Sequence, residues 1–195
     1  LFHCDAVQAP GQLPLNLQTL QTDLLSLSAH KFNGPRGIGL LFARQGIELT
    51  PLIRGGSQER GRRAGTENLP AIAGLAAALD ETAAQQEENA SRLTAMRDRL
   101  IRGLLDIPET VLNGSWEGRL PGNVNVSFAG IEAETLLLLL DQRGIQASSG
   151  SACTSGSLDP SHVLLALGRS PELCRGSLRL SLGPANTMGE VEYML

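Results

Sequence analysis

Residues 71–105 form a continuous stretch that is rich in alanine and leucine and contains no proline. Four apolar side chains in it recur at helical spacing, beside charged neighbours: Leu93, Met96, Leu100 and Leu104. The pattern predicts a long amphipathic helix in two segments that bend near Gln85–Ser91. Because such helices commonly connect two domains, we expect a two-part chain.

The stretches on either side of this helix differ in texture. Residues 1–70 combine glycine and proline with short apolar runs, which indicates strands and turns with little helix. After Pro108 we predict, in order, a strand at Asn123–Phe128, a helix at Glu132–Arg143, a strand at Ile145–Ser148, a helix from Asp159-Pro160 to Gly168 and a strand at Ser177–Leu182. The second part therefore reads as a β-α-β-α-β unit, and the expected class is α/β.

Charge and cysteine usage exclude several classes of protein. Sixteen basic and twenty acidic residues give a net charge of −4, without the basic run that a nucleic-acid partner requires. The longest apolar run, Leu136–Leu140, is far shorter than a membrane span. Three widely spaced cysteines without a CxxC pair indicate a reducing, cytoplasmic compartment, and with three histidines no metal site is expected.

Lys31 follows the apolar run Leu24–Leu27 and precedes a Gly-Pro-Arg-Gly turn. A lysine at a strand end is commonly an ordinary solvated charge. Ser28 and His30 nevertheless offer a hydroxyl and a ring nitrogen at the same point, beside glycines that permit close approach to the backbone. An amine beside a phosphate-binding pocket suggests a Schiff-base cofactor, pyridoxal phosphate.

Three further side chains are candidates for chemistry. Asp5, at the end of an apolar strand, could pair with a protonated pyridine nitrogen, although the residue taken by itself favours a role as a helix or turn cap. Cys153 lies in a loop of Ser, Gly, Ala and Thr, where an exposed thiol is a candidate nucleophile. Arg179 lies on the polar face of a strand, where it could clamp a carboxylate or form a surface ion pair. Cys4 and Cys174 read as core residues.

Four ordered motifs carry a resemblance to a known family: SAHKFNGPRGIG, GGSQERGRRAGTEN, SSGSACTSGS and SLRLSLG. They resemble the cysteine desulfurases of the NifS/IscS type, which belong to the class-V aminotransferase group of pyridoxal phosphate enzymes. The short spacer in SGSACTS is similar to the branch that has a long, mobile cysteine loop.

The resemblance implies a role for each candidate residue. Lys31 would bind pyridoxal phosphate covalently, with Asp5 on the pyridine nitrogen and Gln8 on the phenolic oxygen. The phosphate would contact Ser28 and His30, and Thr66 would reach the phosphate of the partner subunit in a homodimer. Arg179 would hold the carboxylate of L-cysteine, and Cys153 would take its sulfur for a sulfur-acceptor protein such as an iron–sulfur scaffold.

Members of this family are about twice as long as the chain, so we expect a C-terminal half. Residues 1–70 would complete the large cofactor-binding domain, residues 71–107 would link the domains, and residues 108–195 would form the small C-terminal domain. We expect this chain alone neither to hold the cofactor tightly nor to turn over. The alternatives are a related class-V lyase such as selenocysteine lyase, a class-V transaminase, or a non-catalytic sulfur carrier or scaffold.

Overall fold

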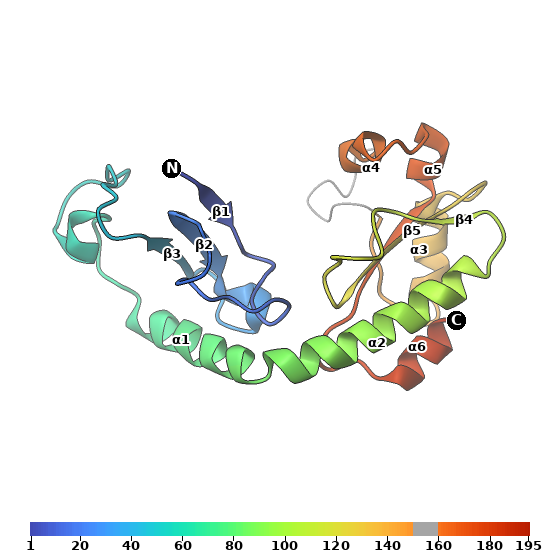
Figure 1. Cartoon of the computed structure of the whole chain (residues 1–195), viewed down its shortest axis with the longest axis horizontal. Helices are drawn as coiled ribbons and strands as arrows, with labels where there is room; N and C mark the ends of the chain where they lie inside the picture. Colours follow the sequence, from blue (N-terminus) through green and yellow to red (C-terminus); the bar gives the residue numbers. More distant parts are fainter. Residues whose placement is uncertain (150–159) are drawn as a thin grey trace. The chain divides into compact units, whose positions relative to one another are not determined.

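The computed structural model describes residues 1–149 and 160–195. The chain divides into two compact units, Leu1–Glu88 and Asn89–Leu195. Each unit contains a three-stranded sheet and its own apolar core (Figure 1). The cores form on the helix-covered faces of the sheets, which leaves the opposite faces for polar side chains.

The sheet of the first unit has the order β1-β2-β3, and its strands are His3–Asp5, Leu24–Ser28 and Gly39–Ala43. β1 pairs parallel to β2, and β3 pairs antiparallel to β2. Leu25 and Leu27 of β2 are buried in a core shared with Leu75 of helix α1 (Leu69–Ala84). Because side chains alternate along a strand, the serines of β2 occupy the other face.

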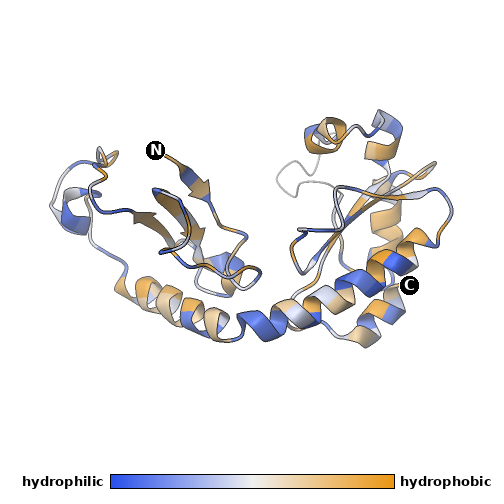
Figure 2. Ribbon diagram, in the orientation of Figure 1, coloured by the Kyte–Doolittle hydropathy of each residue, from blue (hydrophilic) through white to orange (hydrophobic). Residues whose placement is uncertain are grey.

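Two helices follow one another where a bent amphipathic helix was predicted. α1 ends at Ala84 and α2 spans Gln86–Leu105, so the break falls at Gln85, the first residue of the predicted bend. The Asn68 side chain caps α1 by accepting a hydrogen bond from the Ala71 N–H, 3.2 Å away. Figure 2 shows that the beginning of α2, with sequence QEENAS, is hydrophilic. The predicted register of α2 is confirmed, since its four leucine and methionine positions are buried.

The sheet of the second unit is antiparallel, with the order β4-β5-β6. Its strands are Thr110–Leu112, Asn123–Phe128 and Ser177–Ser181. Val124, Val126 and Leu178 have no exposed surface and pack with apolar side chains of α2, α3 (Ala133–Asp141) and α6 (Met188–Met194). The alternation predicted for β5 and β6 is confirmed, with Leu178 and Leu180 on the core face.

The predicted β-α-β-α-β order of this unit is wrong. Residues 145–148 form no strand; they make an isolated bridge in which Ser148 pairs with Arg179. The Ile145 N–H donates to the Leu140 carbonyl, and Gly144 lies in the left-handed region at φ 74°; together they end α3. The Ile145 N–H is therefore used at the helix end and is not available for pairing with a strand.

A second correction concerns the helix expected from Asp159-Pro160. Asp159 lies outside the described residues, and α4 spans His162–Ala166 with Ser161 at its N-cap. Pro160 therefore precedes the cap instead of taking the first helical position. The short helix α5, Pro171–Arg175, was not predicted; Ser170 caps it and Pro171 begins it. The order after α2 is β4, β5, α3, α4, α5, β6, α6.

Candidate functional site

The first unit brings several of the predicted residues to one edge of its sheet. β1 and β2 are parallel, so their carboxyl ends meet at the same edge. Asp5 is the last residue of β1, and β2 ends at Ser28. The 3₁₀ turn Ala29–Phe32, labelled η1, follows at once and contains His30 and Lys31. The edge therefore collects a carboxylate, a hydroxyl, an imidazole and an amine.

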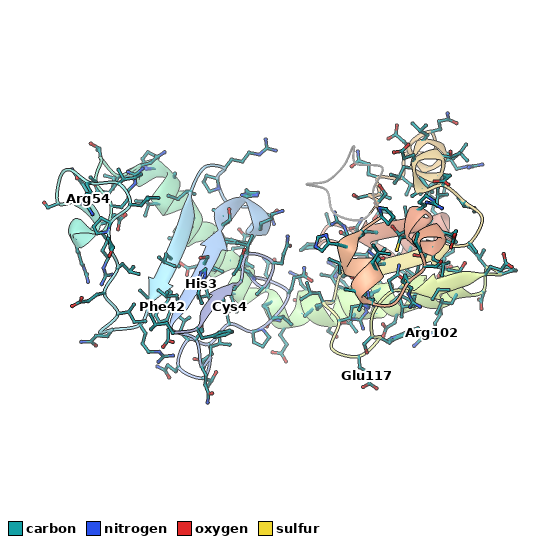
Figure 3. The ribbon with its side chains drawn as sticks, turned by 90° about the horizontal axis from the view of Figure 1, so that it is seen from above. His3, Cys4, Phe42, Arg54, Arg102 and Glu117 are labelled. Atoms are coloured by element: carbon teal, nitrogen blue, oxygen red, sulfur yellow. The ribbon has the colours of Figure 1, made fainter. Side chains whose placement is uncertain are left out.

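The register places the polar groups on one face of the sheet. Asp5 pairs with Ser26 across β1 and β2, and Ser28 lies two residues further along the same face. His3, also on this face, has its Nε2 2.7 Å from the Ser26 Oγ. Figure 3 shows His3 and Cys4 on β1. The Asp5 Oδ1 accepts a hydrogen bond from the Val7 N–H at 3.1 Å, which holds the carboxylate at the end of its strand.

The local sequence holds Lys31 outward. Ala29 and Phe32 are buried, 0% and 3% exposed, and anchor both ends of the turn. Asn33 ends it in the left-handed region at φ 64°, and the Gly34 N–H donates to the Ala29 carbonyl at 2.9 Å. Lys31, between the anchors, is exposed, and it is the only lysine of the chain. That count is a sequence signal that the motif-based prediction did not use.

Polar side chains and two glycines lie together at this edge. The Ser28 Oγ and the His30 Nδ1 lie 2.9 Å apart, so the hydroxyl and the imidazole are a pre-formed pair. Gly39 pairs with Ser28 across β2 and β3, and a Cβ at Gly39 would lie 2.8 Å from the Leu27 carbonyl oxygen. Gly37 has φ 82°, which favours glycine. The Ser28 and His30 side chains suit a phosphate, the Lys31 amine suits an aldehyde carbon and Asp5 suits a protonated ring nitrogen, so these residues fit pyridoxal phosphate.

Thr66 and Gln8 are the two other predicted residues of this unit. Thr66 lines an open cavity of about 790 Å³ together with Gly39 and three arginines of the turn before it, Arg60, Arg62 and Arg63. Gln8 is exposed, three residues beyond Asp5. Within the described part of the chain, neither side chain forms a hydrogen bond with Lys31. The roles of Thr66 and Gln8 remain predictions.

Arg179 belongs to the second unit. It lies on β6 opposite Asn125 of β5, and its backbone N–H and carbonyl both bond to Ser148, at 2.6 and 3.1 Å. Its Nε is buried and has no hydrogen-bond partner among the described residues. A buried guanidinium nitrogen needs an acceptor, so the prediction of a carboxylate ligand gains a structural reason.

The cysteines differ in what the structure describes. Cys153 lies outside the described residues. Cys4 is half-buried against the first core, and Cys174 is buried in the second unit, as predicted for both. Burial raises the pKa of the Cys174 thiol, against the weaker opposing influence of Arg169. Cys174 is therefore a poor nucleophile. The described residues contain no cluster of His, Cys, Asp and Glu side chains that could hold a metal ion.

Comparison with known proteins adds the family. The family model described as aminotransferase class-V matches residues 1–194. The chain belongs to the class-V aminotransferase family. A cysteine desulfurase IscS from Methanosarcina thermophila is 56% identical over 194 residues, which are 100% of this chain and 48% of that protein. The chain thus spans about half the length of the curated relatives it matches.

Solved structures of the family have the same mixed α/β fold. A structure titled NifS-like protein superposes with a TM-score of 0.88 at 39% identity, over 98% of this chain and 49% of that one. A structure titled SspA in complex with cysteine gives a TM-score of 0.73 at 34% identity, over 95% of this class-V chain and 51% of its own. Among the described residues, no helix is both long and apolar enough to cross a bilayer.

Sequence reasoning missed one set of polar residues in this class-V chain. Asn113, Ser127 and Ser177 are buried on the sheet face that carries Arg179, each 3% exposed or less. The alternation N-V-N-V-S-F had predicted which face is polar, but not that this face is covered. The available signal was that N-V-N-V-S-F and S-L-R-L-S both carry polar residues at every second position.

Proposed function

We propose that the full-length protein containing this chain is a cysteine desulfurase that uses pyridoxal 5′-phosphate. The placement of Asp5, Ser28, His30 and Lys31 at one edge of the first sheet is the observation that carries the proposal. The identity with cysteine desulfurases over the whole chain supports the choice of substrate. L-cysteine would be converted to L-alanine, with the sulfur left on the enzyme as a persulfide.

The chain's residues would hold the cofactor from both ends. Ser28 and His30 would donate to the phosphate, and Asp5 would keep the pyridine nitrogen protonated. Gln8 would contact the phenolic oxygen, and Lys31 would bind the aldehyde carbon. When bound, pyridoxal phosphate supplies an electron sink that acidifies the α-carbon of an amino acid.

Lys31 and Asp5 would then divide the acid–base work. The Lys31 Nζ, exposed on the turn η1, can accept a proton from the α-carbon of cysteine. Asp5, whose carboxylate accepts from the Val7 N–H, would hold negative charge near the ring nitrogen. Arg179 would orient the substrate through its carboxylate.

Cys153 would act as the sulfur acceptor. Its thiolate attacks the sulfur of cysteine; a sulfur–sulfur bond forms and the carbon–sulfur bond breaks. The electron pair of the broken bond stays with carbon, which takes up a proton and leaves as alanine. Cys174 is unsuited to this step, because burial keeps its thiol protonated.

The assembly follows from the same proposal. Residues 1–70 would complete the cofactor domain, residues 71–107 would form the linking helix region, and residues 108–195 would form the small domain with the cysteine loop. Thr66 would contact the cofactor phosphate of a partner subunit, so the working form would be a homodimer. The persulfide would pass in the cytoplasm to an acceptor such as an iron–sulfur scaffold protein.

The experiment that tests the function compares two cysteines in the full-length protein. With pyridoxal phosphate and L-cysteine, the wild type and Cys174→Ala should release alanine and carry a persulfide on the peptide that contains Cys153. Cys153→Ala should still bind the cofactor and should form neither product. A persulfide on Cys4 or Cys174 in the wild type, or alanine release by Cys153→Ala at the wild-type rate, would overturn the proposal.

A further inference from the structure

The polar face of the second sheet contains a chain of hydrogen bonds whose directions can be assigned one after another. It begins at Arg169, which donates from Nε to the Asn113 Oδ1 at 3.0 Å and from its terminal nitrogen to the Leu112 carbonyl at 2.6 Å. A guanidinium can only donate. The Asn113 amide must therefore turn its oxygen to Arg169 and its NH2 group the other way.

That NH2 group has two acceptors within reach. The Asn113 Nδ2 lies 2.7 Å from the Asn125 Oδ1 and 2.8 Å from the Ser127 Oγ. Asn113 is 3% exposed, so the orientation is held inside the unit rather than by solvent. The Asn125 amide must in turn offer its oxygen to Asn113, and the usual ambiguity between amide oxygen and nitrogen is removed at both residues.

The strand order then fixes where the Asn125 NH2 group lies. β5 is the central strand, with Asn113 following β4 on one side and Arg179 on β6 on the other. Since the Asn125 oxygen is turned to the β4 side, its nitrogen is on the β6 side. Asn125 and Arg179 are direct partners in the antiparallel ladder, and paired side chains on one face stand about 4.5–5.5 Å apart at Cβ.

Two donor groups thus stand side by side on this face. The Arg179 Nε is buried and has no hydrogen-bond partner in the part of the chain that the structure describes, and the half-buried Asn125 turns its NH2 group to the same side. A buried donor without an acceptor is costly, so the Arg179 Nε needs an acceptor, and the Asn125 NH2 group stands where it can donate to the same one.

We infer that Asn125 is a second substrate-contacting residue, which donates its amide NH2 to the same carboxylate that Arg179 binds. The inference rests on the proposed function, because it takes this carboxylate to be that of the amino-acid substrate. Asn113 and Arg169 are positioning residues, because they fix the direction of the Asn125 amide and do not themselves touch the carboxylate. The site selects α-amino acids over amines that lack a carboxylate.

Asn125→Asp tests the donor alone. Aspartate keeps an oxygen for the Asn113 NH2 group, so the internal network survives, and it replaces the donor beside Arg179 with a negative oxygen. Asn123→Asp is the matched control: it adds the same charge two residues away on the same strand face, and keeps the oxygen that accepts from Arg119 at 3.0 Å. Asn123 pairs with Ser181, not with Arg179.

In the full-length holoenzyme, Asn125→Asp should raise KM for L-cysteine by at least about 10-fold, as expected for losing a hydrogen bond to a charged group. Its kcat should change far less, and KM for cysteamine, which lacks the carboxylate, should stay within about 2-fold of the wild-type value. Asn123→Asp should leave both KM values near those of the wild type. A milder variant, Arg169→Gln, should raise KM for L-cysteine by less than Asn125→Asp does.

Titration with L-alanine gives a readout that needs no turnover. Asn125→Asp should weaken its binding by about 10-fold and Asn123→Asp should not, even if the wild type proves inactive on cysteine and the proposed function fails. The inference is overturned if Asn125→Asp binds L-alanine as the wild type does, if Asn123→Asp has an equal effect, or if cysteamine and cysteine are affected alike. The last result would mean that a carboxylate of the protein, and not that of the substrate, accepts from Asn125 and Arg179.

Discussion

The two sheets of this class-V aminotransferase chain use their polar faces in opposite ways. In the first unit, three of the reactive groups at the carboxyl edge of β1 and β2 are exposed: Asp5, His30 and Lys31, of which the last two extend from a turn anchored by the buried Ala29 and Phe32. In the second, Asn113 and Ser127 are buried in a hydrogen-bonded network. The proposed proton-transfer group, Lys31, is exposed to solvent, whereas the amide of Asn113 is held in one orientation by hydrogen bonds.

The comparison predicts that substitutions at the exposed edge of the first sheet change chemistry and leave stability near that of the wild type, whereas removing a side chain of the buried network in the second unit lowers stability. Lys31→Ala should have the largest effect. It removes the proposed base and cofactor anchor, so turnover of L-cysteine should fall by at least about 10²–10⁴-fold. Thermal unfolding should stay near that of the wild type because the side chain is exposed. Arg36→Ala, an exposed cation five residues on, is the control and should retain activity.

Asn113→Ala should reverse this pattern. Loss of the amide takes away the acceptor of the Arg169 Nε and the donor to the Asn125 Oδ1, and a buried unsatisfied group costs about 1–3 kcal/mol. Urea unfolding of residues 89–195 within the full-length protein measures this loss. A variant as stable as the wild type would show that the hydrogen-bonded network does not stabilise the second unit, and would contradict the proposed difference between the two sheets.

A smaller effect is expected at the N-terminus of α6. Thr187 and Glu190 form a reciprocal capping box, with the Thr187 N–H 2.7 Å from the Glu190 Oε2 and the Glu190 N–H 3.3 Å from the Thr187 Oγ1. Thr187→Ala should cost about 0.5–2 kcal/mol of unfolding free energy, measured by urea denaturation. Its effect is confined to stability, because the cap contacts no proposed site residue.

The same box gives a pH dependence. The hydrogen bond from the Thr187 backbone, followed by that from Asn186, lowers the pKa of Glu190. A carboxyl with a lowered folded-state pKa stabilises the fold above its unfolded pKa, and this contribution disappears as the pH falls through the folded value. The stability difference between the wild type and Glu190→Gln should therefore shrink on acidification. A constant difference would exclude the carboxylate as its source.

Ser28→Ala should have the smallest effect on stability, within about 0.5 kcal/mol, because its hydroxyl pairs with the exposed His30. It should nevertheless weaken binding of pyridoxal phosphate to the full-length protein, measured by fluorescence titration. His30→Ala offers a second test of the same pair. If either variant unfolds the first unit, the Ser28–His30 pair stabilises the fold, and the proposed difference between the two sheets is contradicted.

Patterns along the sequence predicted the elements that are strongly periodic. The spacing from Leu93 to Leu104 and the alternation around Val124 and Leu178 placed α2, β5 and β6 within one or two residues. These patterns failed where local hydrogen bonds determine the secondary structure, because the Ile145 N–H ends helix α3 and does not begin a strand. The three-residue strands were too short to show a period.

The site divides in the same way. Lys31, Ser28 and His30 were found because they are neighbours in sequence, and Asp5 because it is a carboxylate at the end of an apolar strand. Asn113, Asn125 and Arg169 are 12 to 56 residues apart, and only the folded sheet brings them into contact. A single sequence carries no signal for such a network beyond the polar alternation of two strands.

One measurement bears most directly on the account: covalent trapping of the cofactor. The full-length protein is incubated with pyridoxal phosphate, treated with borohydride, digested and analysed by mass spectrometry. The account predicts a pyridoxyl group on the peptide that contains Lys31, and its disappearance in Lys31→Ala. Trapping at a different lysine, or none at any lysine in the wild type, would contradict it.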